Sequence, residues 1–278
     1  MQWGGGRGGG NIEDRRGLGP AGVGGLGAGG VVLALIGYFV FGIDPSTTLS
    51  VVGGGQQVEQ QAGVRGAPAD EAGRFVDVVA TNVDDVWKQQ MQGYQPPEAV
   101  VLYDRATGTG CGTGQSAMGP FYCPTDRKVY LDLSFWQDLE SQLGASGEAA
   151  RAYVIAHEIG HHVQTLTGAS EASRRMGTRG AESGSVRLEL QADCYAGVWA
   201  AHASAVSGGQ VTLNPRDIED GLRAASAVGD DTLQRKSQGR VMPDAFTHGS
   251  SEQRMTWFRR GVERGDPAAC DTFRTNAL

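Results

Sequence analysis

The chain has 278 residues, with 31 acidic against 24 basic side chains and a formal net charge of −7. This length suffices for one substantial domain plus accessory segments. The acidic balance and the lack of a basic stripe argue against nucleic acid as a partner. Four cysteines are too few for a disulfide-based scaffold, and the absence of a Cys-x-x-Cys pair argues against a structural zinc ribbon.

The first 22 residues are low in complexity, with a glycine-rich run that contains only Arg7 as a charged residue. A segment of this composition cannot bury enough apolar surface to offset the entropy lost on ordering. The sequence therefore predicts a disordered tail over residues 1–22.

Residues 23–43 carry no charged side chain. Helical residues in this number span about 30 Å of hydrocarbon. A secretory signal peptide is the alternative, because Arg15 and Arg16 precede the apolar run. The run is long for the core of a signal, and residues 43–46 have no small-x-small cleavage pattern. We therefore expect a single transmembrane helix over residues 23–43.

Charge sets the expected orientation of this helix. Three arginines precede it, whereas no basic residue follows until Arg65. The positive-inside rule then predicts a cytoplasmic N-terminus and a single-pass protein of the cell membrane. Residues 44–69, rich in glycine and glutamine, are expected to form a flexible tether to an extracytoplasmic domain over residues 70–278. The oligomeric state is left open.

The domain begins with an amphipathic pattern that predicts a helix from about residue 70 to residue 91. Residues 99–103 and 128–133 are predicted strands, separated by a glycine-rich loop over residues 107–115. A helix is expected over residues 134–143. These elements indicate an α+β domain that is mainly helical and has a small sheet.

The stretch 154–164 contains His-Glu-x-x-His, formed by His157, Glu158 and His161. On a helix, histidines four residues apart lie on one face, so both can bind one metal ion while Glu158 points at a metal-bound water. Zinc accepts such ligands and lowers the pKa of its bound water to about 7. Chance would place this pattern in roughly one such sequence in two hundred, so its context has to decide.

The flanks of this motif favour a helix. Ser146 can cap its start, and Gly168 can end it. Gly160 lowers helix stability by about 1 kcal/mol relative to alanine. A glycine there makes sense if another backbone or a substrate approaches closely, although it could also be incidental.

A second predicted helix, over residues 185–199, carries Glu189 and Asp193 four residues apart on one face. HEIGH followed by ELQAD resembles the gluzincin pattern of HExxH followed by ExxxD. The resemblance implies that Glu189 is the third zinc ligand. It also implies that Asp193 orients a ligating histidine.

Nearly the whole chain resembles the neutral zinc metallopeptidases of the YpfJ type. The residues that carry this resemblance, besides the metal motif, are Asn11–Gly17, Gly119–Pro124, Thr247–Gly249 and Arg254. It implies a zincin-like domain with a Zn²⁺ cofactor and a peptide or protein substrate, in which Glu158 is the general base. It does not define that substrate further.

Two alternative functions stay open. The same fold could serve as a noncatalytic zinc-bound scaffold or regulatory module, or as a hydrolase of non-peptide amides.

We expect one of the two predicted strands to hold the substrate as an added strand. A small sheet that only covers the helices is equally compatible with the sequence.

Three further histidines lie outside the predicted set of metal ligands. His248 could donate a hydrogen bond to the oxyanion of a tetrahedral intermediate, since a similar Thr-His pair followed by Arg occurs in membrane-associated gluzincins. The alternative is a structural hydrogen bond before a helix. His162 is rotated about 100° from His161 and is predicted to be structural. His202 is expected on a solvated face.

The cysteines suggest two disulfides in an oxidising compartment. Cys111 with Cys123 would close the glycine-rich loop, and Cys194 with Cys270 would join the helix of Glu189 to the C-terminus. Four cysteines allow three pairings, so the sequence does not settle this one. Cys194 could instead be a small buried residue.

Overall fold

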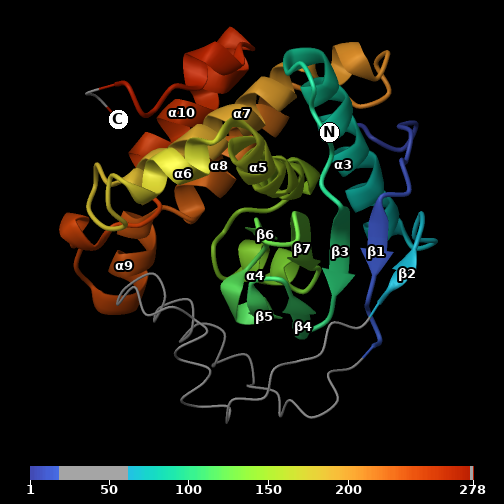
Figure 1. Ribbon diagram of the computed structural model, residues 1–278, viewed down its shortest axis with the longest axis horizontal. Coiled ribbons are helices and arrows are strands. Elements are labelled where there is room, and N and C mark those ends of the chain that lie inside the picture. The colour runs from blue at the N-terminus through green and yellow to red at the C-terminus, as the bar shows by residue number, and fades with distance from the viewer. Residues whose placement is uncertain (19–61, 276–277) are drawn as a thin grey trace.

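The computed structural model describes residues 1–18, 62–275 and 278. Its main sheet has five strands in the order β2-β1-β3-β7-β6, and a separate hairpin has two. The strands are β1 (Ile12–Asp14), β2 (Val64–Arg65), β3 (Ala99–Tyr103), β4 (Ala106–Thr109), β5 (Gly112–Gln115), β6 (Phe121–Cys123) and β7 (Lys128–Asp132). Most of the helices lie above this sheet in Figure 1, whereas α4 is drawn among its strands, and the combination confirms the expected α+β class.

The helices begin where the sequence supplies capping residues. Asp70 accepts a hydrogen bond from Gly73, and capping boxes pair Asn214 with Asp217 and Ser250 with Gln253. The helices are α3 (Glu71–Gln90), α4 (Phe135–Ser141), α5 (Glu148–Thr167), α6 (Ala169–Arg174), α7 (Gly184–Val206), α8 (Pro215–Ala227), α9 (Asp230–Gln238) and α10 (Ser251–Arg264). Short 3-10 helices cover Ser116–Met118, Pro243–Ala245 and Pro267–Cys270.

The central strand β3 runs parallel to both β1 and β7. Because side chains alternate along a strand, Val100 and Leu102 join the main core with α3 and α5, whereas Val101 and Tyr103 belong to a second cluster. The strand order places both predicted strands, β3 and β7, in the interior of the sheet. The expectation that one of them holds a substrate at a sheet edge is wrong, because β6 and β2 occupy the edges.

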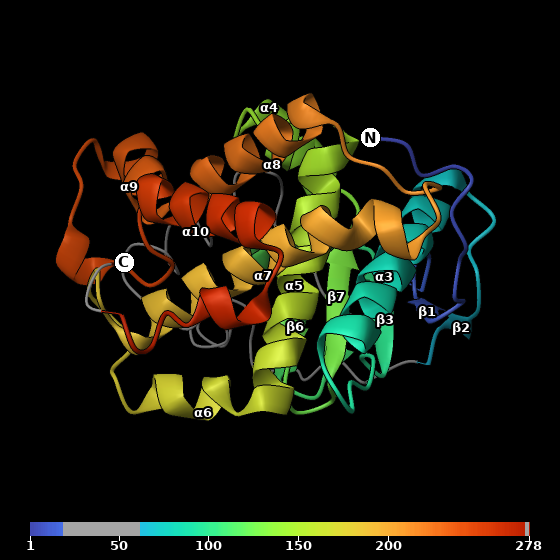
Figure 2. The same ribbon diagram turned by 90° about the horizontal axis from the view of Figure 1, so that it is seen from above.

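The close approach of α5 to α7 depends on Gly160. A Cβ at this position would lie 3.3 Å from both the Cα and the carbonyl oxygen of Ala192. Any larger side chain would push the helices apart. Gly160 thus has the packing role that the sequence suggested, and Figure 2 shows the two helices crossing at the centre of the molecule.

The predicted disorder of residues 1–22 is wrong for residues 1–18. Trp3 is only 9% exposed, and β1 pairs with β3. Glycine is needed here for contact with α3, because a Cβ at Gly8 would lie 2.2 Å from a carboxylate oxygen of Asp77. The amide of Gly9 donates to Thr81 Oγ1 at 2.7 Å. The glycine-rich composition thus reflects close packing in this segment.

A buried ionic cluster fixes β1 in the sheet. Glu13 accepts hydrogen bonds from Arg15 at 2.7 Å and from Lys128 at 2.8 Å. Arg15 also donates to Thr107 and to the carbonyl of Gly108, at 2.9 and 2.8 Å. This part of the Asn11–Gly17 motif therefore stabilises the fold.

The predicted membrane span, residues 23–43, lies outside the described residues. Among the helices that the structure describes, none combines the length and hydropathy needed to cross a bilayer. β1 and β2, one on each side of that segment in sequence, pair with each other. This pairing conflicts with a cytoplasmic tail over residues 1–22 opposite an extracytoplasmic domain, because a single crossing would separate the two strands. β2 also replaces part of the predicted tether.

Other local expectations differ in detail. The predicted loop 107–115 contains most of the β4–β5 hairpin, and Gly147 rather than Ser146 precedes α5. Both suggested disulfides are present, Cys111 with Cys123 and Cys194 with Cys270. The first joins the hairpin to β6, and the second joins α7 to the C-terminal segment.

Candidate metal centre

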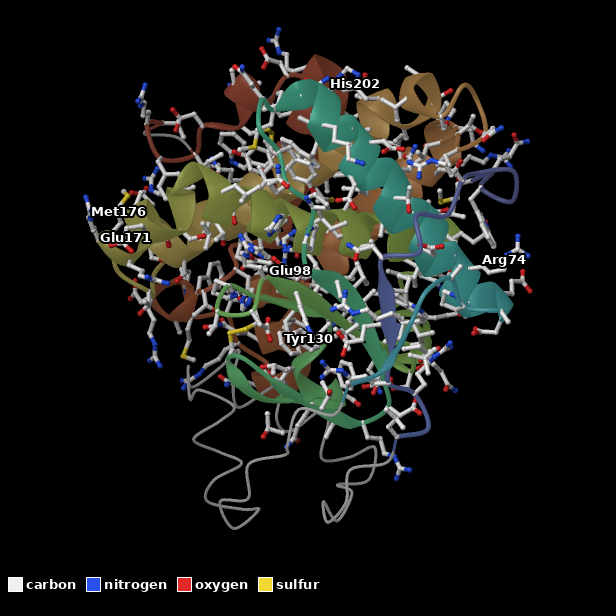
Figure 3. All side chains as sticks on the ribbon, turned by 45° about the vertical axis from the view of Figure 1, so that its right-hand side comes forward. Arg74, Glu98, Tyr130, Glu171, Met176 and His202 are labelled. Atoms are coloured by element: carbon white, nitrogen blue, oxygen red, sulfur yellow. A yellow bond between two sulfur atoms is a disulfide. The ribbon has the colours of Figure 1, made fainter. Side chains whose placement is uncertain are left out.

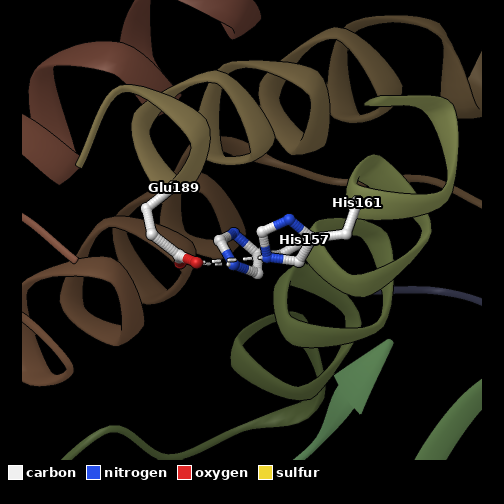
Figure 4. A group of neighbouring side chains, drawn as sticks. All are labelled: His157, His161 and Glu189. Atoms are coloured by element: carbon white, nitrogen blue, oxygen red, sulfur yellow. Dashed lines mark ion pairs between the residues drawn. The ribbon is translucent and has the colours of Figure 1, made fainter. Parts of the chain in front are cut away.

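His157 and His161, from α5, face Glu189 of α7 (Figure 4). Their Nε2 atoms lie 3.2 and 3.4 Å from the two carboxylate oxygens of Glu189. The candidate ligand atoms of the three residues all lie within 4.8 Å of one another, so together they could hold one metal ion. The structure thus brings together the three predicted ligands from two helices.

A buried hydrogen-bond network orients His157. Its Nδ1 lies 2.9 Å from Asp193 Oδ1, which leaves Nε2 directed at the candidate metal site. Arg254 donates to both oxygens of Asp193, and Tyr153 donates its hydroxyl to Oδ1. Burial acts to raise the pKa of Asp193, but Arg254 and His157 outweigh it and hold the pKa below its usual value. Asp193 is therefore an anion that orients His157. This is the role that the family resemblance implied for Asp193.

Gln164 orients the second histidine. Its Oε1 lies 2.8 Å from His161 Nδ1. Its amide nitrogen donates to the carbonyl of Leu188 at 2.6 Å and to Gln191 Oε1 at 3.2 Å. Gln191 in turn donates to the carbonyl of Cys270 at 3.1 Å. A neutral amide thus holds His161, in contrast to the carboxylate that holds His157.

Glu158 lies beside the two histidines and is only 7% exposed. It lines the same cavity of about 450 Å³ as His157, His161 and Glu189. Burial raises the pKa of the Glu158 carboxyl, although both histidines oppose the shift. A carboxylate with a raised pKa is a stronger base at neutral pH.

His248 also lines this cavity. Asp230 holds its loop by accepting the backbone amides of Thr247, His248 and Gly249 at 2.7, 2.7 and 3.1 Å. The second oxygen of Asp230 lies 3.3 Å from His248 Nδ1. Burial lowers the pKa of His248, but Glu189 and Asp230 outweigh it and raise the pKa overall.

The other two histidines have structural contacts. His162 is buried, with Nε2 at 2.7 Å from the carbonyl of Gln95 and Nδ1 at 3.0 Å from the Tyr122 hydroxyl. His202 was expected on a solvated face but is half-buried, and its Nε2 lies 2.7 Å from the carbonyl of Gly265. Figure 3 shows His202 at the end of the molecule opposite the β hairpin.

The donor set of this centre fits zinc. Two imidazoles and one carboxylate are a common ligand set of catalytic zinc sites, which keep a further position for water or substrate. The Nδ1 contacts of both histidines to acceptors are also typical of such ligands, because they fix the ring and its tautomer. His157, His161 and Glu189 would therefore hold the ion.

Sequence reasoning missed Gln164, Tyr153 and Asp230 and gave Arg254 no role. Tyr153 lies four residues before His157 and Gln164 three residues after His161, so helical spacing could have identified both as neighbours of the ligands. Asp230 and Arg254 reach the site from α9 and α10, which are distant in sequence from the motif. No local pattern indicates Asp230, and Arg254 was named only as part of the family resemblance.

Comparison with known proteins identifies the family of the chain. The model of a family described as "putative neutral zinc metallopeptidase" matches residues 1–273, and the chain belongs to this family. It is 46% identical over 295 aligned positions to the uncharacterized protein YpfJ of Escherichia coli K12, covering 98% of this chain and 99% of that protein. It is 50% identical over 214 positions to the uncharacterized protein Mb2605 of Mycobacterium bovis, covering 73% and 72%. No solved structure matches the chain.

Proposed function

We propose that this protein is a zinc-dependent metallopeptidase that hydrolyses peptide bonds of a peptide or protein substrate. One observation carries the proposal: His157, His161 and Glu189 converge beside the buried Glu158 in a single cavity. A zinc ion held there supplies a Lewis acid for the substrate carbonyl and for water. Membership of the metallopeptidase family supports the same reaction class.

Two side chains would act directly on the reacting groups. Glu158 accepts the proton of the attacking water and passes it to the leaving amine. Its burial and raised pKa support this role. His248 donates a hydrogen bond to the oxygen on which negative charge develops. Asp230 supports that role by holding the backbone and the ring of His248.

Two residues would act through the ligands. Asp193 and Gln164 keep the Nε2 atoms of His157 and His161 directed at the metal site. Residues that orient metal ligands affect metal affinity and activity without contacting the substrate. Both are therefore positioning residues in this proposal.

We further propose that the domain works outside the cytoplasm, where its two disulfides are stable. Attachment to the cell membrane through residues 23–43 stays a prediction from the sequence.

The test compares full-length protein with its Glu158→Gln variant, in zinc content and in cleavage of an unbiased peptide library. We expect zinc in both proteins and cleavage by the parent alone, because the variant keeps all three ligands but lacks the base. Zinc in both with no cleavage by the parent would contradict the peptidase proposal and favour a zinc-bound scaffold. Equal cleavage by both would contradict the role of Glu158.

A further inference from the structure

A second cavity, of about 410 Å³, lies between α3 and the segments that lead into β1 and β3. Figure 1 and Figure 2 both show α3 beside these two strands. The volume is in the range of small-molecule binding sites. Among the described residues, none lines both this cavity and the one at the metal centre. It is therefore a separate candidate site.

The base of this cavity holds a buried carboxyl group. Asp84 of α3 is only 8% exposed, and its Oδ1 accepts a hydrogen bond from the Tyr94 hydroxyl at 2.6 Å. Within residues 1–18 and 62–275, no hydrogen-bond donor contacts its other oxygen, and the residue lines the cavity. Burial raises the pKa of the Asp84 carboxyl to about 7. Once ionised, this carboxylate gains from a cationic group of a ligand.

The surroundings of Asp84 suit an ammonium group better than a metal ion. Among the described residues, only the three ligands of the metal centre form a group that could hold an ion. Pro96 and Pro97 line the cavity and have no backbone N–H, so the main chain there can only accept hydrogen bonds. An ammonium group has three N–H donors and no acceptor. It therefore matches both the carboxylate and this part of the wall.

The rim of the cavity carries an excess of positive charge. The side chains of Arg7, Lys88 and Arg127 line it and are 49–61% exposed. Arg7 and Lys88 share one carboxylate, that of Asp85, at 2.6 and 3.0 Å, whereas Arg127 pairs with Glu98. Pairs as exposed as these contribute little stability. The cations can therefore turn to an anionic group of a ligand.

The spacing of the two kinds of charge sets the length of the ligand. Asp84 and Lys88 are four residues apart on α3, which corresponds to a rise of about 6 Å. A free amino acid carries its ammonium and its carboxylate on one carbon atom. Each further residue of a peptide adds up to about 3.5 Å between them. A peptide of two or three residues therefore reaches from the base to the rim.

We propose that this cavity binds short peptides by their two charged ends. The ammonium group of the peptide contacts Oδ2 of Asp84, and its terminal carboxylate contacts the cations of the rim. Short peptides are products of peptide hydrolysis, so the ligand class is compatible with the function proposed above. The binding itself requires neither zinc nor cleavage.

The test measures binding of trialanine to full-length protein by isothermal titration calorimetry. The protein carries Glu158→Gln, so that the proposed peptidase cannot consume the probe. We expect trialanine to bind, and its N-acetylated form to bind about tenfold more weakly or worse, because acetylation removes a charge-assisted contact. The C-terminal amide should lose less, because the rim is exposed. Free alanine should bind more weakly than trialanine, because it cannot reach the rim.

Two variants locate the peptide. Asp84→Asn keeps an acceptor for Tyr94 but removes the charge, and it should weaken trialanine binding about tenfold. The control Glu71→Gln, at the exposed start of the same helix, should not. Lys88→Gln should reduce the difference between trialanine and its amide, with Arg74→Gln as control. Figure 3 shows Arg74 far from Glu98, which lines the cavity.

The probe series and Lys88→Gln leave the buried carboxyl untouched, so the test stands even if Asp84→Asn fails to fold. Absence of trialanine binding, equal affinity for its acetylated form, or tighter binding of free alanine would overturn the proposal. Binding that neither Asp84→Asn nor Lys88→Gln changes would place the peptide elsewhere and would overturn it too. Each of these outcomes leaves the peptidase function standing, because that function depends on other residues.

Discussion

Arg254 and Asp193 form a buried two-point contact at the base of the metal centre. Nε of Arg254 donates to Oδ2 of Asp193 at 2.8 Å, and Nη2 donates to Oδ1 at 2.9 Å. Asp193 Oδ1 also lies 2.9 Å from Nδ1 of His157. Helix α10 thus stabilises the anion that orients the first histidine of the motif.

Arg254→Met should therefore destabilise the protein. Removing one partner of a buried ion pair leaves the other charge uncompensated, at a cost of about 3–5 kcal/mol. The measurement is the free energy of unfolding in urea. Arg259→Met, on the exposed side of the same helix, is the control and should change that free energy by less than about 0.5 kcal/mol. Similar losses in both variants would contradict the role of Arg254.

Gln164→Leu should weaken zinc binding. The substitution removes the acceptor for His161 Nδ1 and the two bonds that fix the amide. Loss of such a supporting contact typically costs about 10- to 100-fold in metal affinity. The measurement is the zinc dissociation constant, by competition with a chelator, with the exposed Gln137→Leu as control. An unchanged dissociation constant for Gln164→Leu would show that His161 needs no such partner.

The two disulfides should differ in their contribution to stability. Cys194 and Cys270 are 76 residues apart, whereas Cys111 and Cys123 are 12 apart. By loop entropy alone the first is worth about 4.5 kcal/mol and the second about 3 kcal/mol. Alanine at both positions of each pair, followed by unfolding in urea, tests this order. A larger loss for the shorter loop would contradict the entropic explanation.

Asp84 should make stability depend on pH. Burial raises the pKa of its carboxyl from 3.8 to about 7, against smaller opposing effects of Tyr94 and Lys88. Because the folded pKa exceeds the unfolded one, the folded state holds an extra proton between these values. The stability from this group is complete below about pH 4 and is lost as the pH rises through about 7.

Asp84→Asn cannot ionise and removes this effect. Relative to the variant, the parent should become progressively less stable in urea from pH 5 to pH 8, because only the parent must release the proton. Above pH 8 the difference should be constant. A difference that stays the same from pH 5 to pH 8 would show that Asp84 is ionised throughout.

Local patterns predicted the elements that form the metal centre. The apolar periodicity of α3 and the spacing of His157 and His161 on α5 depend on residues within one or two turns. The role of Glu189 on α7 as the third ligand came instead from the resemblance of ELQAD to the gluzincin pattern. β3 and β7 were predicted from β-branched and aromatic residues in short runs. Because these patterns are local, they can be recognised in a single sequence.

Several contacts between distant segments could not be predicted. Arg254 and Asp193 are 61 residues apart, and no spacing rule joins them. Residues 1–18 have the composition of a disordered segment. They are ordered because they contact α3 and the sheet. The β4–β5 hairpin lacks apolar alternation, and a disulfide joins it to β6. In each case tertiary contacts outweigh local preference.

The central claim is that His157, His161 and Glu189 bind one zinc ion. The most direct measurement is the zinc content of purified full-length protein, combined with X-ray absorption spectroscopy at the zinc edge. We expect one zinc ion per chain with nitrogen and oxygen ligands, and loss of that zinc in the Glu189→Ala variant while the fold is retained. A folded parent without stoichiometric zinc, or zinc bound by sulfur, would contradict the claim.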